Sequence, residues 1–141
     1  MGRLRYAHLL LTLMLGCSTL GPTPVAQPGL GASRLRPPAS LQCPRDHLTA
    51  FSGEVTSFQR GADRVVLRLR TDDAGTKQIT LDYPEGSDLT QWFLLKGEAF
   101  RPEDWEQVES PQQRLREHMR AVVWVCDDGT NPIIDWQPRP H

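Results

Sequence analysis

The sequence has few cysteines, few aromatic residues and little net charge, and these scarcities exclude some classes of protein. Its 141 residues contain three cysteines, 7% aromatic side chains and a formal net charge of −1. Nonspecific nucleic-acid binding needs a surplus of Lys and Arg. Without residues 1–16, which include Arg3 and Arg5, 14 basic groups face 17 acidic ones, a net charge of −3. We therefore expect no nucleic-acid partner.

The motifs of common enzyme and cofactor sites are also missing. The chain has no glycine-rich phosphate loop, no H-E-x-x-H and no C-x-x-C. Isolated cysteines without a histidine at ligand spacing do not make a zinc site. We therefore predict no catalytic residues, no enzyme, no metal and no cofactor.

No apolar run reaches the roughly 20 residues that span a bilayer. The run 9–15 is interrupted only by Thr12, and it follows the basic residues Arg3, Arg5 and His8. A basic segment before a short apolar one is typical of a signal peptide. The apolar run ends in Met14-Leu15-Gly16-Cys17.

This ending resembles the lipobox of bacterial lipoproteins, in which a small residue precedes a cysteine. The resemblance implies that residues 1–16 are a signal peptide and that Cys17 carries a lipid, with further acylation, such as palmitate, on the new amino terminus. Met14 departs from the family, which most often has leucine there. Ser18 implies sorting to an outer membrane, facing the periplasm, in a cell that has one. An ordinary secretory peptide with an incidental cysteine is the alternative.

Residues 17–42 are interpreted as a lipid anchor and linker. The stretch 18–40 contains five prolines, three glycines and no aromatic residue. Such a composition buries too little apolar surface to offset the entropy of ordering. We predict a disordered tether that holds residues 43–141 away from a membrane; an arm without a spacing role is the alternative.

Two cysteines remain once Cys17 is assigned to lipid. In an exported protein an even remainder favours a disulfide. We predict a bond between Cys43, where the linker ends, and Cys126, which ends the apolar run "AVVWVC". Two buried free thiols are the alternative.

Residues 64–84 predict a β-hairpin, because apolar residues alternate on both sides of the turn sequence Asp72-Asp73-Ala74-Gly75. Pairing Thr71 with Lys77 puts Leu67 opposite Leu81 and keeps the apolar sets on one face. The outer face then presents the candidate binding residues Arg64, Arg68, Arg70, Gln78 and Thr80. A solvated face without a ligand is the alternative.

The remaining elements predict a mainly β domain. A strand with a bend at Gly53 precedes the hairpin, a helix follows Pro102, a second helix spans 110–118, and two strands surround Asp127–Asn131. This order resembles the OB-fold over residues 48–137: a small five-stranded barrel with a helical insertion between strands 3 and 4. Another small barrel or an open β-sandwich is the alternative. Trp124 and Trp136 are interpreted as core residues.

We expect a lipid-anchored, exported binding or assembly module of the bacterial cell envelope. Its expected partners are the membrane, through the lipid, and an envelope protein or anionic envelope ligand. One alternative is a structural accessory subunit of an envelope complex. Another is a small hydrolase with an atypical site around His47 or Asp127.

Overall fold

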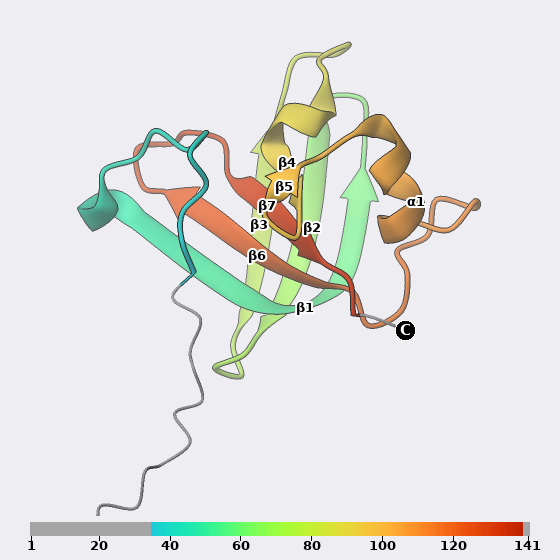
Figure 1. Cartoon of the computed structure of the whole chain (residues 1–141), viewed down its shortest axis with the longest axis horizontal. Helices are drawn as coiled ribbons and strands as arrows, with labels where there is room; N and C mark the ends of the chain where they lie inside the picture. Colours follow the sequence, from blue (N-terminus) through green and yellow to red (C-terminus); the bar gives the residue numbers. More distant parts are fainter. Residues whose placement is uncertain (1–34, 140–141) are drawn as a thin grey trace, which may run out of the picture. The chain divides into compact units, whose positions relative to one another are not determined.

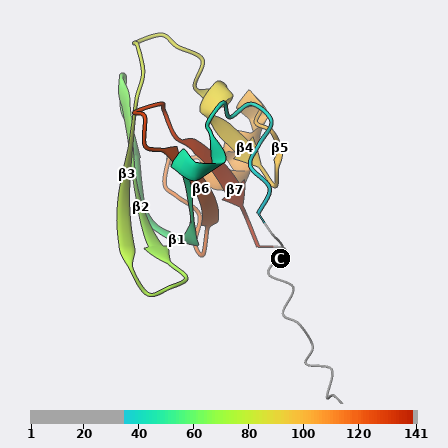
Figure 2. The same cartoon turned by 90° about the vertical axis from the view of Figure 1, so that its left-hand side faces the viewer.

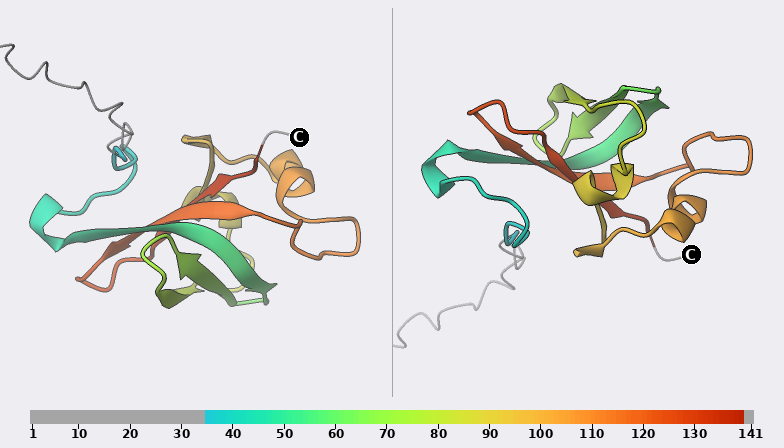
Figure 3. Two further views of the ribbon diagram at one scale, coloured as in Figure 1. Left: turned by 90° about the horizontal axis from the view of Figure 1, so that it is seen from below. Right: turned by 90° about the horizontal axis from the view of Figure 1, so that it is seen from above.

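One long strand, β1 (Leu48–Arg60), links the two halves of the sheet in the computed structural model, which describes residues 35–139. The first half of β1 pairs antiparallel with β6 (Arg120–Cys126), and its second half pairs with β2 (Arg64–Thr71). The strand curves strongly between these partners (Figure 1 and Figure 3). Gly53 pairs with both neighbours, and a Cβ atom there would lie 2.1 Å from the backbone oxygen of Arg70. This close approach admits only glycine.

The sheet has seven strands in the order β3-β2-β1-β6-β7-β4-β5. The other strands are β3 (Thr76–Asp82), β4 (Phe93–Leu95), β5 (Glu98–Ala99) and β7 (Ile133–Gln137). Among the strand pairs within residues 35–139, the β4–β7 pair alone is parallel. Figure 2 shows β2 and β3 on one side and β6, β7, β4 and β5 on the other, so the sheet folds over on itself.

The predicted mainly β domain with a short helical insertion is confirmed, but the predicted five-stranded barrel is wrong in its strand count and its closure. Within residues 35–139 the sheet has two open edges, β3 and β5. A barrel of five strands would close by pairing β3 with β7. That edge of β7 is instead occupied by β4, which pairs with it from Phe93 to Leu95.

Short helical turns lie in the connections. They are η1 (Arg45–His47), η2 (Leu89–Trp92), η3 (Pro102–Asp104) and α1 (Trp105–Val108). The helix expected after Pro102 is present, and Asp104 caps it by accepting a hydrogen bond from the Arg101 N–H at 2.9 Å. The predicted second helix is wrong: residues 109–115 form a hairpin-like loop with a bridge between Glu109 and Leu115. Gln113 in this loop has a φ of 56°.

The predicted β2–β3 hairpin exists, but its register differs by two residues from the predicted one. Leu67 pairs with Ile79, and Leu69 pairs with Lys77. The loop is closed by a hydrogen bond from the Thr71 N–H to the Gly75 oxygen, at 2.9 Å. Because the error is an even number of residues, Leu67 and Leu69 still face the core.

The hydrophobic core fills the space between the two halves of the sheet. Trp136 and Phe93 are among its largest fully buried side chains. A second, smaller cluster lies around Val122, Trp124 and Ile133 and includes Leu41 from the segment before β1. Trp124 and Trp136 are therefore both buried, as expected, but in different clusters.

The predicted disulfide between Cys43 and Cys126 is confirmed, with Cα atoms 6.1 Å apart and a sequence separation of 83. It joins the segment before β1 to the end of β6. The alternative of two free thiols is therefore wrong. Cys17 and most of the predicted linker lie outside the described residues. No helix within residues 35–139 is long and apolar enough to cross a membrane.

Candidate functional site

The predicted arginine face, defined by Arg64, Arg68, Arg70, Gln78 and Thr80, is assembled by β2 and β3 as expected. All five residues are exposed. Arg68 stands opposite Gln78, whereas Thr80 stands opposite Val66.

Two of the three arginines on this face are already neutralised. Nε of Arg64 lies 2.5 Å from Oδ1 of Asp82. Nη2 of Arg70 lies 2.6 Å from Oε2 of Glu54 on β1. Arg68 instead donates to the neutral Oε1 of Gln78, at 3.1 Å. The face therefore carries much less positive charge than its arginines indicate.

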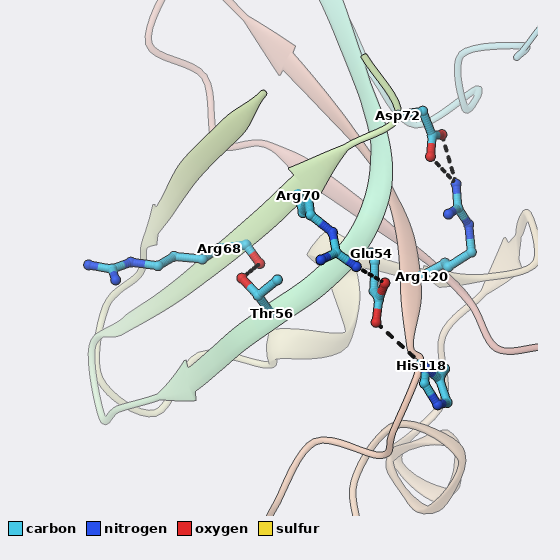
Figure 4. A network of polar contacts seen from close by, with 7 residues as sticks. All are labelled: Glu54, Thr56, Arg68, Arg70, Asp72, His118 and Arg120. Carbon is cyan, nitrogen blue, oxygen red and sulfur yellow. Dashed lines mark hydrogen bonds and ion pairs between the residues drawn. The ribbon is translucent and has the colours of Figure 1, made fainter. Parts of the chain in front are cut away.

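A polar network continues from this face to the middle of β1 and the start of β6 (Figure 4). Glu54 lies between Arg70 and His118, whose Nδ1 is 3.6 Å from Glu54 Oε1. Nη2 of Arg120 lies 2.7 Å from both carboxylate oxygens of Asp72. Figure 4 shows the Arg68 guanidinium extending away from these pairs.

Hydrogen bonds lower the pKa values of the acids in this network. The pKa of Glu54 is lowered chiefly by its hydrogen bond from Arg70, and that of Asp72 by its bond from Arg120. Both carboxylates are therefore held in the charged form. The open hollow beside them measures about 330 Å³. It is lined by charges that already satisfy one another, so it offers little net attraction to an ion.

The structure brings together two residues that the sequence analysis singled out separately. Nδ1 of His47 lies 2.8 Å from Oδ1 of Asp127, and Nε2 lies 3.6 Å from Asp46. Both the histidine and Asp127 are more than half exposed. Within residues 35–139 no group of three or more His, Cys, Asp or Glu side chains is placed to hold a metal ion.

A second region, which the sequence analysis missed, lies beside α1. A cleft of about 420 Å³ opens there, within the size range of small-ligand pockets. We call it the Trp105 cleft, and its lining residues are Trp105, Glu106, Glu109, Ser110, Pro111 and Arg116. In Figure 1, α1 and the loop after it lie beside the end of β1.

Arg60, the last residue of β1, holds the wall of this cleft in place. Its guanidinium carbon lies 4.1 Å from the centre of the Trp105 ring, and its Nη2 lies 2.9 Å from Oε2 of Glu109. The Glu109 side chain is only 8% exposed, so this ion pair is largely removed from water. Trp105 is fixed further by Phe93 and Phe100, with ring centres 5.1 and 4.8 Å away.

The opposite wall is the loop that replaces the predicted second helix. Arg116 fixes this loop by donating from Nε to the Glu106 oxygen at 2.8 Å and from its N–H to the Val108 oxygen at 2.9 Å. The Ser110 N–H donates to the Arg114 oxygen at 2.8 Å. The hydroxyl of Ser110 is buried and has no hydrogen-bond partner. A buried polar group without a partner costs stability and calls for an explanation.

Local sequence offered only a weak signal for this cleft. The acids after Pro102 predicted α1, but the capping pattern at Ser110-Pro111 favoured a helix where the cleft wall lies. A helix of nine residues is marginal without strong packing. The strand-like bridge between Glu109 and Leu115 forms instead.

The comparisons with known proteins are sparse. Over 85 residues, 60% of its length, the chain is 25% identical to a Haemophilus influenzae protein named "Putative soluble lytic murein transglycosylase". The chain spans 14% of the length of that protein. No family model matches the chain. No solved structure matches it either.

This match contradicts the sequence prediction that the chain is not an enzyme, because the matched protein is named as one. The prediction rested on the absence of familiar catalytic motifs, and such motifs describe only some enzyme classes. It is therefore withdrawn.

Proposed function

We propose that this protein is a lipid-anchored, exported module of the bacterial cell envelope that binds a component of the cell wall. Cys17 carries the lipid, and the Pro/Gly-rich linker spans the distance between a membrane and the folded domain. The membrane is the outer one in a cell that has it, with the domain in the periplasm.

The observation that carries the proposal is the Cys43–Cys126 disulfide. Disulfides persist in oxidising compartments outside the cytoplasm. The bond also uses both cysteines of the domain, which leaves Cys17 of the lipobox-like stretch for the lipid. Two or more acyl chains give stable anchoring without a transmembrane helix.

The relative's name supports the choice of ligand. Murein is the cell-wall polymer of glycan strands and short peptides, and the matched protein is named as acting on it. A shared segment of 85 residues in a much longer enzyme favours a module that contacts the polymer.

We also propose that the domain is a variant of the OB-like barrel, opened by the β4–β5 hairpin. Support comes from β1, which pairs with β2 on one side and β6 on the other, and from the helical turns placed between β3 and β6. OB-folds are themselves partly open barrels. Arg68 is the arginine that an anionic ligand would meet on the β2–β3 face, because its partner Gln78 is neutral.

The test is the intact mass of the protein from its native membrane fraction, measured with and without reductant and alkylation. We expect a chain beginning at Cys17, increased by acyl groups, with no thiol free to alkylate before reduction. A chain cut elsewhere and without lipid would contradict the anchoring. Co-sedimentation of the full chain with purified cell-wall sacculi tests the binding, with bovine serum albumin as the unbound control.

A second candidate is the small hydrolase considered from the sequence, and the 2.8 Å contact between His47 and Asp127 favours it. A carboxylate beside a histidine orients the ring for general base catalysis. Replacing His47 with Gln should abolish any hydrolysis of sacculi found for the full chain. Unchanged hydrolysis would remove this candidate.

A further inference from the structure

We infer that the Trp105 cleft is a binding subsite for an uncharged sugar unit of the peptidoglycan glycan strand. The inference rests on the proposed function only for the polymer that supplies the sugar. The chemical class of the ligand is inferred from the residues that line the cleft. Its lining combines an aromatic ring, two carboxylates, a guanidinium and Ser110, whose buried hydroxyl has no partner.

The aromatic wall fits the apolar side of a sugar ring. Trp105 is partly exposed in the cleft, and Phe93, Phe100 and Arg60 hold its position. Arg60 covers one face of this ring and Phe58 stacks with it at 6.0 Å between ring centres, so the C–H groups of a pyranose would pack on the part of the indole that stays exposed. The immobilised ring loses no further side-chain freedom when a ligand binds.

The polar wall fits hydroxyl and amide groups. The bond from Arg60 uses Oε2 of Glu109, so Oε1 is left to accept a hydrogen bond from a ligand. Glu106 is an exposed carboxylate on α1, and it adds a second acceptor. Two carboxylates repel an anionic ligand, and they favour a ligand whose hydroxyl or amide groups donate hydrogen bonds to them.

Ser110 supplies the observation that points most directly to a ligand. Its Oγ atom is buried, yet the residue as a whole is partly exposed in the cleft. The exposed part is therefore the Cβ and backbone side of the residue. For a ligand to satisfy this hydroxyl, the side chain would have to turn about the Cα–Cβ bond to a staggered rotamer that points Oγ into the cleft.

The experiment measures the dissociation constant of the full chain for a tetramer of N-acetylglucosamine, with a tetramer of glucose as the second arm. We expect binding of the first and at least tenfold weaker binding of the second. Ser110→Ala should weaken binding of the N-acetylglucosamine tetramer about tenfold, the loss of one hydrogen bond. Glu106→Gln should weaken it by a similar factor.

Glu98→Gln on β5 is the matched control, because it removes an exposed acid outside the cleft. It should leave the dissociation constant unchanged. The stability of each variant is measured in parallel, and Ser110→Ala should unfold at the same or a higher denaturant concentration. A weaker dissociation constant without loss of stability separates a ligand contact from a structural role.

Equal affinity for both tetramers, no binding of either, or an unchanged dissociation constant for Ser110→Ala would overturn the inference. None of these results bears on the lipid at Cys17 or on the intact mass. Failure of the subsite is therefore distinguishable from failure of the proposed function.

Discussion

The arginine face and the Trp105 cleft are each joined to β1 by an ion pair, through Glu54 and Arg60 respectively, and they differ in how their charges are used. On the arginine face, exposed guanidinium groups pair with Asp82 and Glu54 at the surface. In the cleft, Arg60 forms a largely buried pair with Glu109 and covers Trp105, while the Ser110 hydroxyl stays without a partner. The exposed row of arginines is thus largely neutralised by its neighbours. The Ser110 hydroxyl is one of two buried polar atoms without a partner in residues 35–139, the other being Nε1 of Trp136, and it belongs to a residue that lines the cleft.

The curvature of β1 positions both regions. A substitution that disturbs this curvature should therefore have the largest effect on the free energy of unfolding. Gly53→Ala places a methyl group against the Arg70 backbone, 2.1 Å from its oxygen, so the β1–β2 pairing must shift. We expect a loss of about 3 kcal/mol in the free energy of unfolding, at the upper end of overpacking effects. Urea denaturation measures it. Gly61→Ala, where the nearest backbone atom is 3.2 Å away, is the control and should cost under about 1 kcal/mol.

The two arginine pairs give a direct contrast in energy. Arg60→Met leaves the Glu109 carboxylate buried without its partner, and we expect a loss of about 2 kcal/mol in the free energy of unfolding. Arg70→Met removes an exposed pair and should cost well under about 1 kcal/mol.

Double-mutant cycles with Glu109→Gln and Glu54→Gln measure the two coupling energies. The account requires a larger coupling for Arg60–Glu109 than for Arg70–Glu54. Equal couplings would show that the cleft pair is as solvated as the surface pair.

The buried carboxylate of Asp135 and the partly exposed carboxylate of Glu54 should change stability with pH in opposite directions. Burial raises the pKa of Asp135 above its ordinary value of 3.8, although its oxygen accepts a hydrogen bond from the Gly97 N–H at 3.0 Å. The native state therefore holds the Asp135 proton more tightly than the unfolded chain, and the charged form destabilises the fold as pH rises. Asp135→Asn keeps the acceptor and should raise stability at pH 7 by about 1 kcal/mol. This gain should disappear as the pH falls through the Asp135 pKa towards 3.8.

Glu54→Gln is the counterpart on the arginine face. Because the Arg70 hydrogen bond lowers the pKa of Glu54 below 4.5, the charged form stabilises the native state above that pH. The variant should therefore be slightly less stable than the parent at pH 7, and the difference should shrink on acidification. Thermal unfolding between pH 3 and 7 measures both variants. Parallel pH dependences would contradict the contrast between the two acids.

The smallest expected effect concerns Ser110. Replacing it with Ala removes a buried hydroxyl without a partner, so we expect unchanged stability or a gain of up to about 1 kcal/mol. Thr56→Ala, whose hydroxyl donates to the Arg68 oxygen at 3.4 Å on the arginine face, is the comparison and should lose stability slightly. A clear loss for Ser110→Ala would show that the hydroxyl has a partner within the fold.

The sequence predicted the features that depend on alternation and on cysteine chemistry. Alternation of apolar residues predicted the β2–β3 hairpin and the buried tryptophans. The even number of cysteines left after Cys17 predicted the Cys43–Cys126 bond. The hairpin register was missed because Asp73 accepts hydrogen bonds from Thr71 and Gly75 within the loop. These bonds tighten the turn, and strand pairing begins at Arg70 and Thr76.

The β4–β5 hairpin shows where a local signal existed and was overlooked. Lys96 and Gly97 both have positive φ, 53° and 84°, as a two-residue hairpin turn of the I′ type requires. The parallel pairing of β4 with β7 joins residues about 40 positions apart. Nothing in the local pattern encodes it, so the open sheet and the Trp105 cleft could not be predicted from the sequence.

The most direct measurement compares the two regions on the proposed ligand itself. The full chain, the double variant Glu106→Gln/Ser110→Ala and the arginine-face variant Arg68→Gln are co-sedimented with purified sacculi over a range of sacculus concentrations. The account predicts at least tenfold weaker binding for the cleft variant and binding within twofold of the parent for Arg68→Gln. Weak binding by Arg68→Gln together with parental binding by the cleft variant would contradict it and return the ligand to the arginine face.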